Sequence, residues 1–156
     1  MPTSRLLEAQ HVWEGCRLEP YLDQLGLPTI GRGHRIPSLD HPPITQEEAD
    51  RLFLEDVRAA EKKAIALAPN LTKYPRRLDA LTDLVFNGGS RSLEGKDIHD
   101  PSDDAGVVKA LRAEDWKDAA ARFRNYCHGH LPDGTVVKLE ALVHRRNVGA
   151  RWIEEG

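Results

Sequence analysis

Two acidic side chains and a threonine lie near one another in the N-terminal part of the sequence, with types and spacing that suit acid–base chemistry. Glu14 and Asp23 are nine residues apart, and Thr29 follows Asp23 by six residues. Glycosidic cleavage needs a carboxylic acid that protonates the leaving oxygen and, usually, a second carboxylate that stays ionised. Glu14 and Asp23 are candidates for these roles, and the Thr29 hydroxyl is a candidate for orienting a water molecule.

The expected surroundings of the two carboxyl groups differ. Glu14 falls at the C-terminal end of a helix predicted over residues 4–14, where the negative end of the helix dipole disfavours a charged carboxylate. Its apolar neighbour Trp13 acts in the same direction. Asp23 falls in a polar hairpin and is expected to stay ionised. Taken singly, each residue is more often a solvated or turn-forming side chain, and only their joint spacing favours catalysis.

The elements that must position these residues follow from hydrophobic periodicity and from glycine and proline punctuation. We expect an α+β, mainly helical protein that forms one domain over residues 1–156. A β-containing first lobe is predicted at about 15–45, a connecting helix at about 45–68, and a helical second lobe at about 70–156 on which the first helix packs. The further helices are predicted at about 75–86, 105–126 and 139–153.

Residues 14–34 carry a dense motif, E-G-x-R-L-x-x-Y-x-D-x-x-G-x-x-T-I-G-x-G-H. It resembles, without a gap, the catalytic segment of the phage-type lysozymes, glycoside hydrolase family 24. The resemblance continues through Leu52-Phe53-x-x-Asp56, Leu84-Val85-Phe86-Asn87-x-Gly89 and Leu142-Val143-His144-Arg145-Arg146. Residues 90–104 depart from the family pattern, and Cys16 has no role that we can derive. The resemblance implies a lysozyme-like, two-lobed fold.

The resemblance also implies roles for particular residues. Glu14 would be the general acid, Asp23 the general base or electrostatic stabiliser, and Thr29 the partner of the attacking water, with inversion at the anomeric carbon. It further implies that His34 forms a structural ion pair with Asp56 on the connecting helix, which would tie the two lobes together.

Three residues of the second lobe are supporting or substrate-binding candidates. The periodicity of the last helix places Arg146 inward, where it needs a carboxylate partner. The resemblance makes Glu14 a candidate for that partner, and Arg145 is the alternative residue to contact it. Asn87, before two glycines, is either a helix cap or a substrate contact at the cleft.

The activity implied by the resemblance is that of a muramidase, which hydrolyses the β-1,4 bond between N-acetylmuramic acid and N-acetylglucosamine in bacterial peptidoglycan. We expect a monomer made in a host bacterial cytoplasm and released to the wall with the help of a holin-type pore protein. One alternative is a lytic transglycosylase that uses Glu14 alone. Another is a non-catalytic phage structural module that binds the cell wall.

Composition excludes several other classes of protein. The 156 residues carry a net charge of −3, although residues 105–153 have nine basic against five acidic residues and could face an anionic polymer. We expect no nucleic-acid binding, no membrane insertion and no signal peptide. The two cysteines are expected to be reduced. The spacing of Cys127, His128 and His130 is poor for zinc, so no metal and no cofactor are expected.

Overall fold

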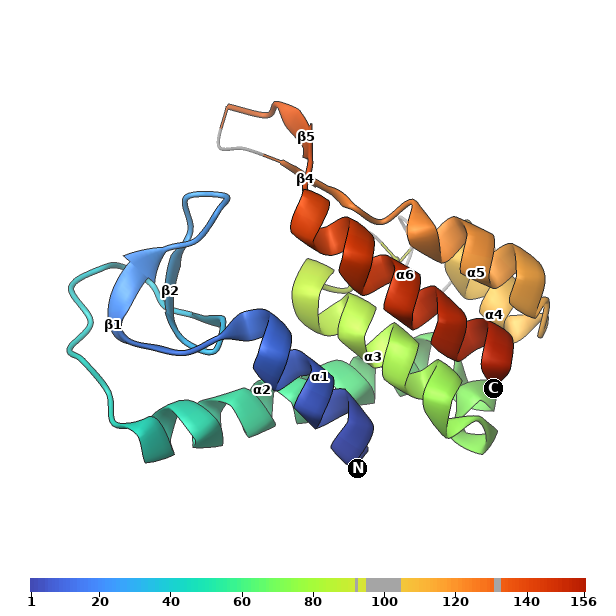
Figure 1. The fold of residues 1–156 in the computed structure, drawn as a ribbon, viewed down its shortest axis with the longest axis horizontal. Coiled ribbons are helices and arrows are strands. Elements are labelled where there is room, and N and C mark those ends of the chain that lie inside the picture. Colours follow the sequence, from blue (N-terminus) through green and yellow to red (C-terminus); the bar gives the residue numbers. More distant parts are fainter. Residues whose placement is uncertain (92, 95–104, 131–132) are drawn as a thin grey trace.

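A small sheet and a larger group of helices are joined by one long helix in the computed structural model, which describes residues 1–91, 93–94, 105–130 and 133–156 (Figure 1). The α+β, mainly helical fold class predicted from the sequence is confirmed. The elements are α1 (Ser4–Glu14), β1 (Arg17–Leu22), β2 (Pro28–Gly31), β3 (His34–Arg35), α2 (Gln46–Leu67), the short 3₁₀ helix η1 (Pro69–Lys73), α3 (Pro75–Gly88), α4 (Gly106–Arg112), α5 (Trp116–Arg124), β4 (His128–His130), β5 (Val136–Lys138) and α6 (Glu140–Glu155).

Helix α1 has the bounds predicted from the sequence, and a capping residue lies at each of its ends. The Thr3 side chain accepts a hydrogen bond from the Leu6 amide and caps the first turn. Gly15 ends the helix with a φ of 61°, which glycine adopts without the steric cost of a Cβ. The helix packs on α3, where the Gln10 amide donates to Asp83. Helix α1 therefore belongs to the helical lobe.

The three-stranded sheet forms the first lobe, with the antiparallel order β1-β2-β3. Its register places Thr29 opposite Tyr21 on one side and Arg35 on the other. The turn between β1 and β2 is closed by hydrogen bonds from the Asp23 amide to the Leu27 carbonyl and from the Gly26 amide to the Asp23 carbonyl. A second, smaller core holds the sheet on the first turns of α2, and it consists of Ile30, Ile36, Ile44 and Ala49.

Helix α2 connects the lobes, in agreement with the helix predicted at about 45–68. Thr45 caps it by accepting from the Glu48 amide, and it ends one residue before the Ala68-Pro69 step. Its 22 residues span about 33 Å at the usual rise of a helix. Figure 1 shows α2 running from the sheet to beneath the helical lobe.

Helix α3 lies at the centre of the second lobe. Pro75 begins it, where the missing amide proton costs nothing, and Gly89 ends it with a φ of 73°. It packs against α2 and α6, and α5 packs against α6 and α4. The main hydrophobic core, which includes the fully buried Leu81, Phe123 and Ile153, lies between these helices.

The single helix predicted over 105–126 is wrong, because the chain forms two helices there. Glu114 adopts a φ of 58°, which breaks the helical path between α4 and α5. Asp115 then begins a new helix, since its side chain accepts from the Asp118 amide as an N-cap. Capping at Asp115 thus outweighed the continuing apolar periodicity.

A second hairpin, formed by β4 and β5, was also missed by the sequence analysis, which expected only a turn before the last helix. The strands are antiparallel and pair His128 with Lys138. Figure 1 shows this hairpin projecting beyond the N-terminal end of α6. Most of the divergent 90–104 segment lies outside the described residues.

Candidate active site

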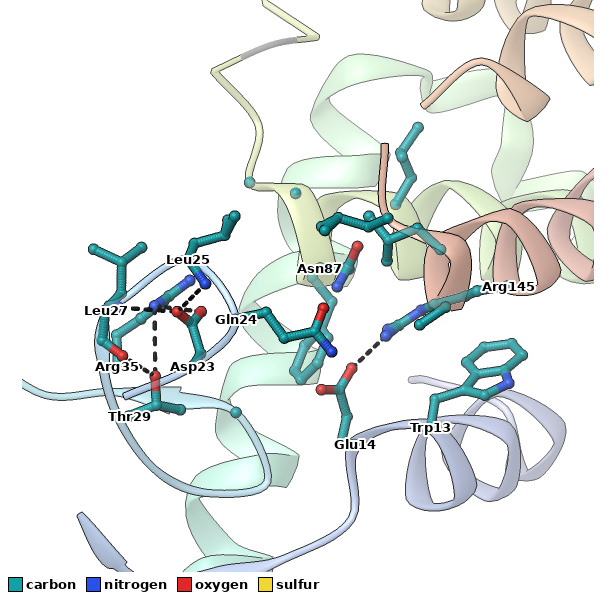
Figure 2. Close-up of a pocket in the computed structure, with 18 of the residues that line it drawn as sticks. Trp13, Glu14, Asp23, Gln24, Leu25, Leu27, Thr29, Arg35, Asn87 and Arg145 are labelled. Carbon is teal, nitrogen blue, oxygen red and sulfur yellow. Dashed lines mark hydrogen bonds and ion pairs between the residues drawn. The ribbon is translucent and has the colours of Figure 1, made fainter. Parts of the chain in front are cut away.

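A cleft of about 1310 Å³ lies between the two lobes. Its walls come from the end of α1, the β1–β2 hairpin, β3, α2, the end of α3 and the start of α6. Glu14, Asp23 and Thr29, the three residues proposed for catalysis from the sequence, all line it. Figure 2 shows Glu14 entering beside α1 and Asp23 entering from the β hairpin. The two carboxyl groups therefore approach the cleft from different lobes.

Glu14 is the last residue of α1, and its side chain is 16% exposed. Its Oε1 atom accepts a hydrogen bond of 2.5 Å from Arg145 Nη1. The other oxygen, Oε2, lies against Gly33, where an added Cβ would come within 3.2 Å of it. One carboxyl oxygen is thus held by the helical lobe, while glycine leaves room for the other next to the sheet.

Arg145 is held in place by a buried carboxylate on α3. Asp83 accepts from Arg145 Nε at 2.9 Å and from Nη2 at 2.7 Å, and the guanidinium carbon lies 5.0 Å from the centre of the Trp13 ring. Burial alone lowers the pKa of Arg145, but the charges of Asp83 and Glu14 outweigh it and leave that pKa raised. Arg145 therefore stays charged beneath Glu14.

Arg146 lies beside this pair, approaches Asp83 with Nη1 at 3.4 Å and makes its shorter contacts to other groups. Its Nε donates to the Tyr126 carbonyl at 2.7 Å, and its Nη2 donates to the Asn87 side chain. Burial lowers the pKa of Arg146 to about 10, with Asp83 opposing the shift, so the side chain remains protonated near neutral pH. Of the two arginines considered from the sequence, Arg145 contacts Glu14, whereas Arg146 fastens the end of α3.

Asp23 is held by backbone and side-chain donors together. Its Oδ1 accepts from the Leu25 and Leu27 amides, each at 2.9 Å, and its Oδ2 lies 2.9 Å from Arg35 Nη1. These contacts hold the carboxylate in one orientation. Thr29, buried in β2, donates to the Leu27 carbonyl at 2.9 Å. Figure 2 shows Asp23, Thr29 and Arg35 grouped at the hairpin side of the pocket.

His34 and Asp56 are brought together as the sequence analysis expected. The distance from His34 Nδ1 to Asp56 Oδ2 is 2.7 Å, and each side chain is about one third exposed, at 30% and 35%. Because His34 belongs to β3 and Asp56 to α2, this contact fastens the sheet to the connecting helix. Asn87, for which the sequence left a choice between a helix cap and a substrate contact, lies within α3 and lines the cleft. Its side-chain oxygen accepts a hydrogen bond from Arg146.

Three residues of the site were missed by sequence reasoning. Gln10, Asp83 and Arg35 each contact a proposed site residue or its immediate support. Asp83 had a readable signal, because an acid within the apolar run of a central helix needs a buried partner. Gln10 and Arg35 had none, since their partners are distant in sequence or lie across a strand pair.

The described part of the chain holds no group of three or more histidine, cysteine or acidic residues arranged to bind a metal ion. Within the same residues, no helix combines the length and apolar character needed to cross a bilayer.

Comparison with known proteins supports the resemblance noted in the sequence. The family model described as phage lysozyme matches residues 11–148. The chain is 33% identical over 115 residues to the endolysin of Salmonella phage P22, covering 70% of this chain and 72% of that protein. It is 28% identical over 137 residues to the endolysin of Acyrthosiphon pisum secondary endosymbiont phage 1, covering 86% and 84%.

Solved structures show the same fold. The active form of the P1 phage endolysin Lyz aligns with a TM-score of 0.77 at 20% identity, over 99% of this chain and 85% of that one. The muramidase domain of SpmX from Asticaccaulis excentricus aligns with a TM-score of 0.71 at 20% identity, over 98% and 97%. With the family model spanning most of the sequence and both lobes, the chain belongs to the phage lysozyme family and is a lysozyme-type glycoside hydrolase.

Proposed function

We propose that this protein is a muramidase that hydrolyses the β-1,4 bond between N-acetylmuramic acid and N-acetylglucosamine in peptidoglycan. The observation that carries the proposal is the entry of Glu14 and Asp23 into one cleft from opposite lobes. A cleft of about 1310 Å³ that is open between the lobes suits an extended glycan strand. The names of the related endolysins and of the SpmX muramidase domain support the same substrate.

In the proposed reaction, the Glu14 carboxyl donates its proton to the glycosidic oxygen as the bond from that oxygen to the anomeric carbon breaks. Water attacks the anomeric carbon, and its proton passes to Asp23, whose carboxylate is oriented by three donors. Thr29 is proposed to orient that water. Attack from the face opposite the leaving group inverts the anomeric configuration.

Arg145 gives Glu14 a fixed orientation and, when Glu14 has lost its proton, a charge partner. We propose that Arg145, together with Arg146, Asn87 and the His34–Asp56 pair, supports the cleft. The two buried arginines brace α3 against α6, while the pair fastens the sheet to α2.

Digestion of purified peptidoglycan, followed by mass spectrometry of the released sugars, tests the proposal. The wild-type protein is expected to release reducing N-acetylmuramic acid ends, and Glu14→Gln should be slower by about 10²- to 10⁴-fold because it cannot donate a proton. Glu8→Gln is the matched control, since Glu8 is exposed on the same helix and loses the same charge.

Other outcomes would replace the proposal. Anhydro ends would identify a lytic transglycosylase, in which the sugar's own hydroxyl attacks in place of water. Absence of cleavage by the folded wild-type protein would leave a wall-binding module. Proton NMR of the first-formed product distinguishes inversion from retention at the anomeric carbon.

The biological role that we propose is lysis of a bacterial host by a monomer made in its cytoplasm. Passage to the wall would then depend on a separate holin-type pore protein. Support comes from the two endolysin relatives.

A further inference from the structure

Arg35 lies between Asp23 and Thr29, two residues proposed to take part in hydrolysis. It pairs with Thr29 across the β2–β3 ladder. Its Nη1 atom donates to Asp23 Oδ2 at 2.9 Å and lies 3.4 Å from Thr29 Oγ1. A single nitrogen therefore bridges the carboxylate and the hydroxyl, and neither composition nor motif pointed to it.

Asp23 and Thr29 are already positioned by other contacts. The Leu25 and Leu27 amides hold Asp23 Oδ1, and the Thr29 hydroxyl donates to the Leu27 carbonyl. Arg35 adds a contact only to Asp23 Oδ2 and to the acceptor side of Thr29 Oγ1. Positioning is therefore not the main consequence of the Arg35 contact.

Arg35 Nη1 occupies a position that suits a water shared by Asp23 and Thr29, because such a water must lie within hydrogen-bond distance of both oxygens. We propose, on the basis of the proposed function, that the Arg35 guanidinium guards this water position, which means that it occupies the position in the free enzyme and keeps the water out. It leaves the position when an anionic group of the glycan substrate attracts it. Substrate carboxylates would thus help to complete the site.

The guard can be displaced at little cost. The Arg35 side chain is 51% exposed, and ion pairs of that exposure contribute little to stability. The long, flexible side chain can turn toward the cleft that it already lines. The carboxylates that would attract it are present on peptidoglycan, in the peptide stems and in the lactyl groups of N-acetylmuramic acid residues that carry no stem.

The charge of the cleft favours such a ligand, although the whole chain is acidic. Among the described residues that line the cleft, three are acidic and five are arginine or lysine. The acidic residues are Glu14, Asp23 and Asp56, and the basic residues are Arg17, Arg35, Lys63, Arg145 and Arg146. A net charge of −3 for the chain therefore coexists with a cationic cleft.

The first test compares native peptidoglycan with peptidoglycan whose carboxyl groups have been amidated by carbodiimide and ammonia. The wild-type protein is expected to prefer the native substrate by about tenfold or more in kcat/KM, the value of one charge-assisted contact. Arg35→Gln should reduce that preference to about twofold or less, by losing activity on native substrate or gaining it on amidated substrate. Arg51→Gln, which removes the same charge from an exposed ion pair outside the cleft, should keep the wild-type preference.

Two kinetic results would overturn the proposal. If Arg35→Gln kept the full preference for native over amidated peptidoglycan, Arg35 would not be the residue that responds to the substrate's charge. An equal loss of kcat on both substrates would show that Arg35 positions Asp23 and does not guard the water.

The second test does not require turnover. The Nε–Hε signal of Arg35 and the Leu25 and Leu27 amide signals are followed by NMR, during titration with a disaccharide that contains N-acetylmuramic acid or with neutral N,N′-diacetylchitobiose. The three signals should move together with the anionic sugar only. Equal responses to both sugars, or none to either, would refute the guard. If the wild-type protein cleaves neither peptidoglycan preparation, the proposed function fails, while the titration still decides the role of Arg35.

Discussion

Replacing Asp83 with asparagine tests whether one buried carboxylate holds the helical side of the cleft together. Asp83 is 1% exposed and accepts from Gln10 Nε2 at 3.1 Å and from both Nε and Nη2 of Arg145. Arg146 Nη1 approaches it at 3.4 Å. Asparagine preserves the volume but removes the charge, and its amide nitrogen meets donors where an acceptor stood.

The expected loss follows from the burial of the two arginines, whose side chains are 5% and 2% exposed. Removal of one partner from a buried ion pair lowers the free energy of unfolding by about 3 to 5 kcal/mol. We expect about 3 kcal/mol, because asparagine retains one acceptor oxygen and Glu14 still compensates Arg145. For a protein of this size the loss corresponds to a decrease in Tm of roughly 6 to 12 °C.

Urea unfolding followed by circular dichroism gives the free energy, and calorimetry gives the Tm. Glu55→Gln is the control, since it breaks an exposed ion pair with Arg51 on α2. It should change the Tm by about 2 °C or less, as expected for a surface substitution.

The reasoning is refuted if Asp83→Asn lowers the free energy of unfolding by less than about 1 kcal/mol while a crystal structure of the variant shows Arg145 and Arg146 still buried. In that case their charges would be compensated by Glu14 and by the carbonyl and amide oxygens. A second readout is activity, because Arg145 should no longer be fixed beneath Glu14. Peptidoglycan cleavage is therefore expected to decrease at temperatures where the variant is fully folded.

Two further substitutions test the glycine beside the acid and a buried carboxyl far from the cleft. Gly33→Ala should reduce both the Tm, measured by calorimetry, and the activity, measured by peptidoglycan digestion. The reasons are the backbone φ of 89° at this position and the approach of the new Cβ to Glu14 Oε2. An unchanged rate would show that this oxygen has room to move. Burial raises the pKa of Asp79 above 3.8, so its carboxyl group binds a proton more tightly in the folded state than in the unfolded state. The contribution of Asp79 to stability therefore decreases as the pH rises from 3.8 through the pKa of the folded state. The stability of the wild-type protein relative to Asp79→Asn should therefore decrease over that interval in urea titrations at successive pH values, and a difference that is constant with pH would contradict this expectation.

Local signals predicted much of the fold correctly. Apolar periodicity and the glycine and proline stops act within a few residues, and they predicted α1, α2 and α3 from the sequence. The failure at α4 and α5 has the same origin, because the apolar periodicity continued while the Asp115 cap began a new helix. Residues 128–138 contain strands too short for a clear alternating pattern, so the β4–β5 hairpin was missed.

The sequence by itself determined the types and order of the site residues, namely the motif at residues 14–34 with its acid, its second carboxylate and its threonine. Only the tertiary structure decided what each of them touches. Whether Arg145 or Arg146 reaches Glu14 depends on the rotation of α6 against α3, and periodicity specifies a face of a helix but not the partner across it. The contacts of Asp83 and Arg35 likewise join segments far apart along the chain or across strands, and such pairings are settled by packing and strand register after the local elements exist.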